Sequence, residues 1–139
     1  MAPTLTDGDL GIAFPAREYR SGNIIAFRQN EKVLIRRIIA CSGSSVSIDE
    51  NGIVTVDGVV LDEPYTAQKA LGQCNIQFPC TVPDGQYFVL GDNRANAVDS
   101  RSTVLGCISK DAIIGRLNVI FWPFTRFQWE PSDRIGGSV

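Results

Sequence analysis

The chain has 139 residues, of which 44% are hydrophobic, enough for one domain with a buried core. Thirteen Lys and Arg stand against fifteen Asp and Glu, and the resulting net charge of −2 gives no indication of a nucleic-acid partner. The absence of histidine excludes catalysis by Ser-His-Asp or Cys-His groups and removes the commonest nitrogen ligand of metals, so we expect neither a metal nor a cofactor.

Short apolar runs, mostly β-branched or aromatic, alternate with turn signals along the whole chain. In chain order the runs are residues 23–27, 33–40, 46–48, 53–56, 87–90 and 112–122. Asp-Gly, Asn-Gly and Ser-Gly pairs lie between them and favour hairpins, because these residues tolerate positive φ. Residues 53–61 (I-V-T-V-D-G-V-V-L) predict one tight hairpin. Since no window shows a helical stripe, we expect an all-β fold, an antiparallel β-sandwich or half-open barrel.

The composition changes only at the end of the chain. We expect one β-domain over residues 1–130 and a flexible tail over residues 131–139, where the sequence has the composition of a loop. No apolar run approaches the roughly 18 residues of a membrane span. We therefore expect a soluble domain, which could be part of an anchored protein.

Four cysteines are present: Cys41, Cys74, Cys80 and Cys107. Their spacing does not resemble that of a zinc site. Cys74 and Cys80 bracket a loop that contains a proline, and two interpretations are open: two unrelated thiols or a disulfide across the loop. We favour the disulfide, which would imply an oxidising compartment.

Four segments resemble, in the right order, sequence boxes of the type I signal peptidase family. Residues 1–5 (M-A-P-T-L) are similar to the M-x-P-T-L that follows the family's nucleophilic serine, and residues 21–27 are similar to its R-G-D-I-V-V-F. Residues 34–43 (L-I-R-R-I-I-A-C-S-G) resemble Y-V-K-R-V-I-G-L-P-G. Residues 91–101 (G-D-N-R-A-N-A-V-D-S-R) are close to G-D-N-R-x-x-S-x-D-S-R, and residues 61–65 (L-D-E-P-Y) match the family's L-x-E-P-Y. The resemblance covers residues 1–122 and implies the family's extracytoplasmic β-domain.

The resemblance also implies a catalytic arrangement, and this sequence departs from it. The family cleaves a peptide bond with a serine whose proton is taken by a lysine, neutral because burial depresses its pKa; a second serine orients that amine. The nucleophile would lie directly before Met1, where the sequence begins. Arg36 stands at the lysine position, and a guanidinium keeps its proton near neutral pH. Ala97 stands at the orienting serine and has no hydroxyl.

Other family features are present in the sequence. The resemblance implies two structural ion pairs at the base of the site, Arg37 with Asp92 and Asp99 with Arg101. The family binds its peptide as an added β-strand with small side chains in shallow pockets. The matching apolar positions are Met1, Leu5, Leu34 and Ile35, which would also suit an ordinary core. Some family members carry a cystine between the third and fourth boxes, in the region of Cys74 and Cys80.

Two functions from different classes fit these observations. The first is a catalytically inactive, signal-peptidase-like protein that binds extended segments of signal-peptide-bearing preproteins or pilin subunits and assists pilus assembly. The resemblance suggests it because inactive relatives occur beside pilin genes in some Gram-positive bacteria. The second is an active membrane-bound signal peptidase I, with the sequence beginning just after its serine. Either would lie on the extracytoplasmic side of the cell membrane, held by a single-pass anchor upstream. Arg36 and Ala97 favour the first.

Overall fold

The structure, a computed structural model, describes residues 1–6, 9–122, 128–129 and 136–137. The surroundings of individual side chains are described for residues up to 118. Twelve strands and one 3-10 helix form in these ranges. In chain order they are β1 (Leu10–Phe14), β2 (Ile24–Gln29), β3 (Lys32–Cys41), β4 (Ser45–Ile48), β5 (Val54–Val56), β6 (Val59–Asp62), β7 (Cys80–Thr81), β8 (Gln86–Leu90), β9 (Ile108–Ser109), η1 (Lys110–Ala112), β10 (Ile113–Trp122), β11 (Gln128–Trp129) and β12 (Gly136–Gly137).

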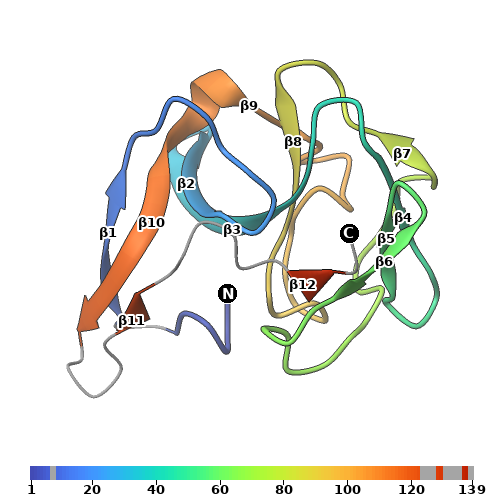
Figure 1. The fold of residues 1–139 in the computed structure, drawn as a ribbon, viewed down its shortest axis with the longest axis horizontal. Helices are drawn as coiled ribbons and strands as arrows, with labels where there is room; N and C mark the ends of the chain where they lie inside the picture. The colour runs from blue at the N-terminus through green and yellow to red at the C-terminus, as the bar shows by residue number, and fades with distance from the viewer. Residues whose placement is uncertain (7–8, 123–127, 130–135, 138–139) are drawn as a thin grey trace.

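The strands form two antiparallel sheets (Figure 1). The larger sheet has the order β1-β10-β2-β3-β8-β9, with β11 also paired to β10, and the smaller has the order β12-β6-β5-β4-β7. In Figure 1, β3 and β8 lie between β1, β10 and β2 on one side and the smaller sheet on the other. The expectation of an all-β, antiparallel fold is confirmed.

The hairpin expected over residues 53–61 is present as β5 and β6. Thr55 pairs with Val60 and Val56 with Val59 across the turn. The turn residues Asp57 and Gly58 have φ angles of 50° and 82°, the left-handed conformation that a two-residue turn of this kind requires at both positions. The Asp-Gly pair thus fixes the register of this hairpin.

Side chains from alternate positions of the larger sheet enter two separate cores. One core lies between the two sheets and includes Phe88 and Leu90 of β8, whereas Val89 between them enters the second core. In β3 this alternation is broken by a register shift between Ile38 and Ala40. A third, smaller cluster joins Ile24 and Leu117 to the N-terminal segment and lies beside the site described below.

The expected tail lies mostly outside the described residues, which omit 130–135 and 138–139. Within it, only Gly136–Gly137 is placed, as β12 paired with β6. The division into a domain over residues 1–130 and a flexible tail therefore stays a prediction. In the part of the chain that the structure describes, no helix is long and apolar enough to cross a membrane.

Candidate functional site

Three segments build the candidate site: residues 1–6, β3, and the loop of residues 91–101 that follows β8. Because β3 and β8 are antiparallel with Arg37 opposite Leu90, the loop begins beside the middle of β3. The N-terminal segment is joined to this loop, since the Thr4 hydroxyl donates to the Asp92 carboxylate and the Asp92 N–H lies 3.4 Å from Met1 Sδ. Strand pairing and these contacts thus bring together three segments that are distant in the sequence: residues 1–6, β3 and residues 91–101.

Arg37 and Asp92, which were expected to pair, form a fully buried two-point ion pair. Arg37 Nε lies 2.9 Å from Asp92 Oδ1 and Nη2 lies 2.8 Å from Oδ2, and both side chains are 0% exposed. The guanidinium also donates to the Gly22 carbonyl and lies over the ring of Tyr65, 3.9 Å from its centroid. The pair therefore fixes β3, the loop after β8 and the N-terminal segment to one another.

Asp99 and Arg101 form a second fully buried pair, which closes the loop of residues 91–101. Arg101 Nε and Nη2 donate to the two Asp99 carboxylate oxygens at 2.8 and 2.7 Å. The same carboxylate accepts from the Gly91 N–H at 3.0 Å, and Arg101 Nη1 donates to the carbonyls of Leu71 and Arg94. Because the loop's polar groups bond to one another, its shape is set by its own sequence.

A third buried pair, between Arg94 and Glu63, was not expected from the sequence. Arg94 Nη1 and Nη2 lie 3.0 and 2.6 Å from the Glu63 carboxylate oxygens, and the Tyr65 hydroxyl donates to the same carboxylate. Burial works against the Arg94 charge, but the hydrogen bonds and the charge of Glu63 raise its pKa overall. The pKa of Tyr65 is raised, mainly by its burial and next by the negative charge of Glu63. All three residues stand in the boxes of residues 61–65 and 91–101, yet the sequence does not indicate that these boxes meet.

Arg36 and Ala97, at the positions of the family's base and its orienting serine, lie close together. Gly91 separates them: a Cβ added there would collide with the Ala97 methyl group and come within 3.5 Å of Arg36 Cδ. Arg36 Nε also donates to the Val98 carbonyl at 3.0 Å. Burial lowers the pKa of Arg36, a change that Asp99 opposes and Arg101 adds to. A guanidinium nevertheless stays charged in proteins, and the Ala97 methyl neither donates nor accepts a proton.

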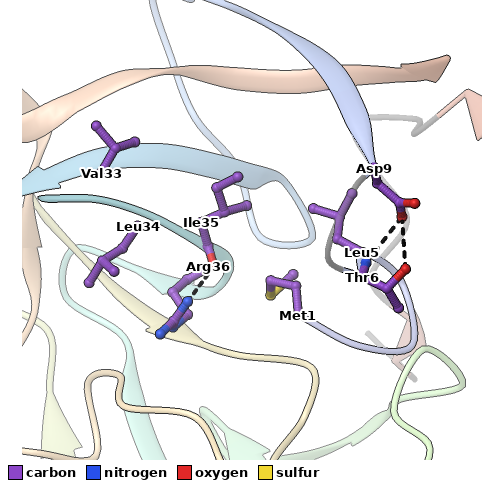
Figure 2. A pocket seen from close by; sticks show the side chains of 8 residues that line it. All are labelled: Met1, Leu5, Thr6, Asp9, Val33, Leu34, Ile35 and Arg36. Atoms are coloured by element: carbon purple, nitrogen blue, oxygen red, sulfur yellow. Dashed lines mark hydrogen bonds between the residues drawn. The ribbon is translucent and has the colours of Figure 1, made fainter. Parts of the chain in front are cut away.

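The four apolar positions expected to bind peptide line one pocket of about 290 Å³ (Figure 2). Met1, Leu5 and Ile35 also pack against the third core cluster, so they are partly core and partly pocket wall. Among the described residues, the lining is Met1, Leu5, Thr6, Asp9, Val33, Leu34, Ile35 and Arg36. The pocket is therefore a recess of mixed character, with apolar side chains, one guanidinium and one carboxylate in its described wall.

The expected disulfide between Cys74 and Cys80 is absent, because all four cysteines are free thiols. Cys74 Sγ lies 3.8 Å from the Ile76 carbonyl oxygen and lines a different pocket. Cys80 in β7 instead packs on the core between the sheets together with Cys107. A spacing of six residues brings two cysteines near in sequence but does not determine where their thiols point.

The site as a whole can hold an apolar chain segment next to a permanent positive charge. Positions 36 and 97 carry no group that accepts a proton at neutral pH. Within the described residues, no three His, Cys, Asp or Glu side chains are grouped so as to hold a metal ion.

Comparison with known proteins identifies the scaffold. The family described as "Signal peptidase, peptidase S26" matches residues 1–122. A signal peptidase I from Enterococcus faecalis V583, known from its crystal structure, superposes with a TM-score of 0.59 at 29% identity, covering 73% of this chain and 98% of that one.

Individual relatives agree with this family match. Signal peptidase I S of Bacillus subtilis is 34% identical over 119 residues, which cover 80% of this chain and 64% of the relative. Probable signal peptidase I-2 of Synechocystis is 35% identical over 138 residues, covering 91% and 61% respectively. The chain therefore spans less than two thirds of the length of either relative. Signal peptidase IB of Staphylococcus aureus MRSA252 is 33% identical over 150 residues, covering 93% and 76%. The chain belongs to the signal peptidase family, peptidase family S26.

Proposed function

We propose that this chain is the extracytoplasmic domain of a signal-peptidase-like protein that binds extended peptide segments without cleaving them. The single observation that carries the proposal is the pair Arg36 and Ala97, which lie on either side of Gly91 at the positions of the family's base and its orienting serine. A serine hydroxyl at this site would find no base at position 36 and no orienting hydroxyl at position 97. Both substitutions remove one shared function, whereas the buried ion pairs of the scaffold are intact.

The pairing of β3 supports binding of an extended peptide. β3 pairs with β2 over Lys32 to Arg37, but with β8 only from Arg37 to Cys41. Along residues 32–36 one edge of β3 therefore has no strand partner among the described residues. Such an edge can accept an added strand, with alternate side chains entering a neighbouring recess. The pocket containing Leu34 and Ile35 lies at this stretch of β3.

The partners that we propose are signal-peptide-bearing preproteins or pilin subunits, with a role in pilus assembly. This role rests on the resemblance to inactive signal-peptidase-like proteins that occur beside pilin genes. We further propose that a single-pass anchor upstream of Met1 holds the domain at the outer face of the cell membrane. The two site substitutions support a binding role over a cleaving one for either partner.

An active signal peptidase is the second candidate, and the comparisons supply the observation that favours it. The relatives named above are signal peptidases at 33–35% identity over most of this chain. For this candidate, a residue other than Arg36 would have to take the proton from a serine located before Met1. The two candidates therefore differ in whether bound peptide is hydrolysed.

Peptide binding with simultaneous detection of cleavage tests the proposal. We expect labelled signal-peptide or pilin segments to bind, measured by fluorescence anisotropy, and to remain intact by mass spectrometry after long incubation. Leu34→Ser should weaken binding about tenfold or more, since it removes apolar contact area from the pocket. Val60→Ser is the matched control, because Val60 is 53% exposed in the other sheet. Absence of binding, or equal binding by both variants, would refute the proposed groove.

A further inference from the structure

Arg36 differs from the other arginines of the site in having no carboxylate partner among the described residues. Arg37, Arg94 and Arg101 are 0–1% exposed and each forms an ion pair with a carboxylate. Arg36 is half-buried, and no carboxylate oxygen among the described residues lies within ion-pair distance of it. Its charge is partly removed from water without the compensation that the other three receive.

The hydrogen bonds of Arg36 hold its guanidinium but leave donors over. Nε donates to the Val98 carbonyl at 3.0 Å and Nη1 to the Ile35 carbonyl at 2.7 Å. A guanidinium has five N–H donors, so most of them remain for a ligand. The nearby Asp99 favours the charge of Arg36, but its two oxygens are already bonded to Arg101 and the Gly91 N–H. The guanidinium is thus positioned before any ligand arrives.

The pocket beside Arg36 carries opposite charges at its two sides. Its carboxylate, Asp9, accepts from the N–H and the hydroxyl of Thr6. Figure 2 shows Asp9 and Thr6 at one side of the pocket and Arg36 at the other, with Met1 between them. A ligand carboxylate would be repelled by Asp9 and attracted by Arg36, so the charge distribution sets its orientation.

We propose that this pocket binds the free C-terminal carboxylate of a peptide that ends in an apolar residue. The carboxylate meets the unused donors of Arg36, and the terminal side chain lies against Leu34, Ile35 and Met1. Guanidinium and carboxylate match in geometry, and charge-assisted hydrogen bonds are stronger than neutral ones. The inference rests on the proposed peptide-binding function and narrows its ligand, because an internal segment of a chain has no charge at this point.

The test compares two labelled peptides of the same sequence, one with a free C-terminal carboxylate and one with a C-terminal amide. We expect the acid to bind about tenfold to a hundredfold more tightly at neutral pH by fluorescence anisotropy. Arg36→Met should remove this difference, and Arg36→Lys should keep part of it, because the charge stays but the planar fork is lost. Arg20→Met, which changes an exposed arginine outside the pocket, should preserve the full difference.

The outcomes separate this inference from the proposed function. If acid and amide bind with equal affinity and Leu34→Ser weakens both, the carboxylate inference is wrong while the groove remains supported. If Arg36→Met, folded by circular dichroism, still prefers the acid, the assignment to Arg36 is wrong. Binding of neither peptide overturns the inference and the proposed function together.

Discussion

Removing the Asp92 carboxylate should strongly destabilise the domain. Asp92→Ala leaves the Arg37 guanidinium without its two hydrogen bonds of 2.8 and 2.9 Å, in a position that is 0% exposed. The Thr4 hydroxyl loses its hydrogen bond to this carboxylate as well. Breaking one partner of a buried ion pair costs about 3–5 kcal/mol, because the remaining charge is no longer compensated.

This magnitude converts into a large change in thermal stability. The entropy of unfolding is about 2.1 cal/mol/K per residue, so a domain of this size loses about 3 °C in Tm for each kcal/mol. The expected decrease is therefore about 10–15 °C. Replacing both partners, with Arg37→Met and Asp92→Leu, should recover part of the loss, since no buried charge is then left unpaired.

Differential scanning calorimetry at neutral pH measures this effect directly. Asp62→Ala is the matched control, because Asp62 is exposed on β6 and has no ion pair among the described residues. It should change Tm by no more than about 2 °C. If Asp92→Ala unfolded at the temperature of the control, the buried pair would not be holding the site together and the structural reasoning above would fail.

Two further predictions concern groups that the sequence did not single out. Glu63→Ala should cost about 3–5 kcal/mol in urea unfolding by leaving buried Arg94 unpaired, and an unchanged midpoint would contradict this. Burial, with the charge and hydrogen bond of Cys80, raises the pKa of Cys107 from 9.0 to about 11. At pH 8 its alkylation should therefore be roughly a hundredfold slower than that of an unperturbed thiol. The protonated thiol favours folding below about pH 9, and this contribution is lost as the pH rises through 11. Mass spectrometry showing Cys107 alkylated as fast as Cys74 would count against the assignment.

The longer strands could be predicted from the sequence because their pattern is local. Residues 87–90 are a continuous apolar run and correspond to β8, and residues 33–40, apolar apart from two arginines, correspond to most of β3. β1 was not predicted, since it is an edge strand whose residues are mostly exposed and whose partner, β10, lies about a hundred residues later. β7 and β9 have two residues each, which is too short for any periodicity to appear.

Some features of the site could likewise be predicted from sequence motifs, whereas others depend on the tertiary structure. The proximity of Arg36 and Ala97 was predictable, because both stand in recognisable boxes. The Glu63–Arg94 pair was not, because the resemblance gives these two residues no shared role, although both stand in recognisable boxes, and only the fold shows that they meet. The expected Cys74–Cys80 bond failed for a related reason: the environment of Cys80 is set by the core between the sheets, whose other members come from distant strands.

The central claim is that Arg36 and Ala97 prevent serine–lysine catalysis on an otherwise intact scaffold. Its most direct test is the rate of signal-peptide cleavage, in membrane-mimetic detergent, by two forms of the chain that both carry serine immediately before Met1. The form with Arg36 and Ala97 should give no cleavage, because neither of these residues can take or orient the serine's proton. The form with Arg36→Lys and Ala97→Ser should cleave after small residues. Cleavage by the first form at a rate comparable to the second would contradict the account.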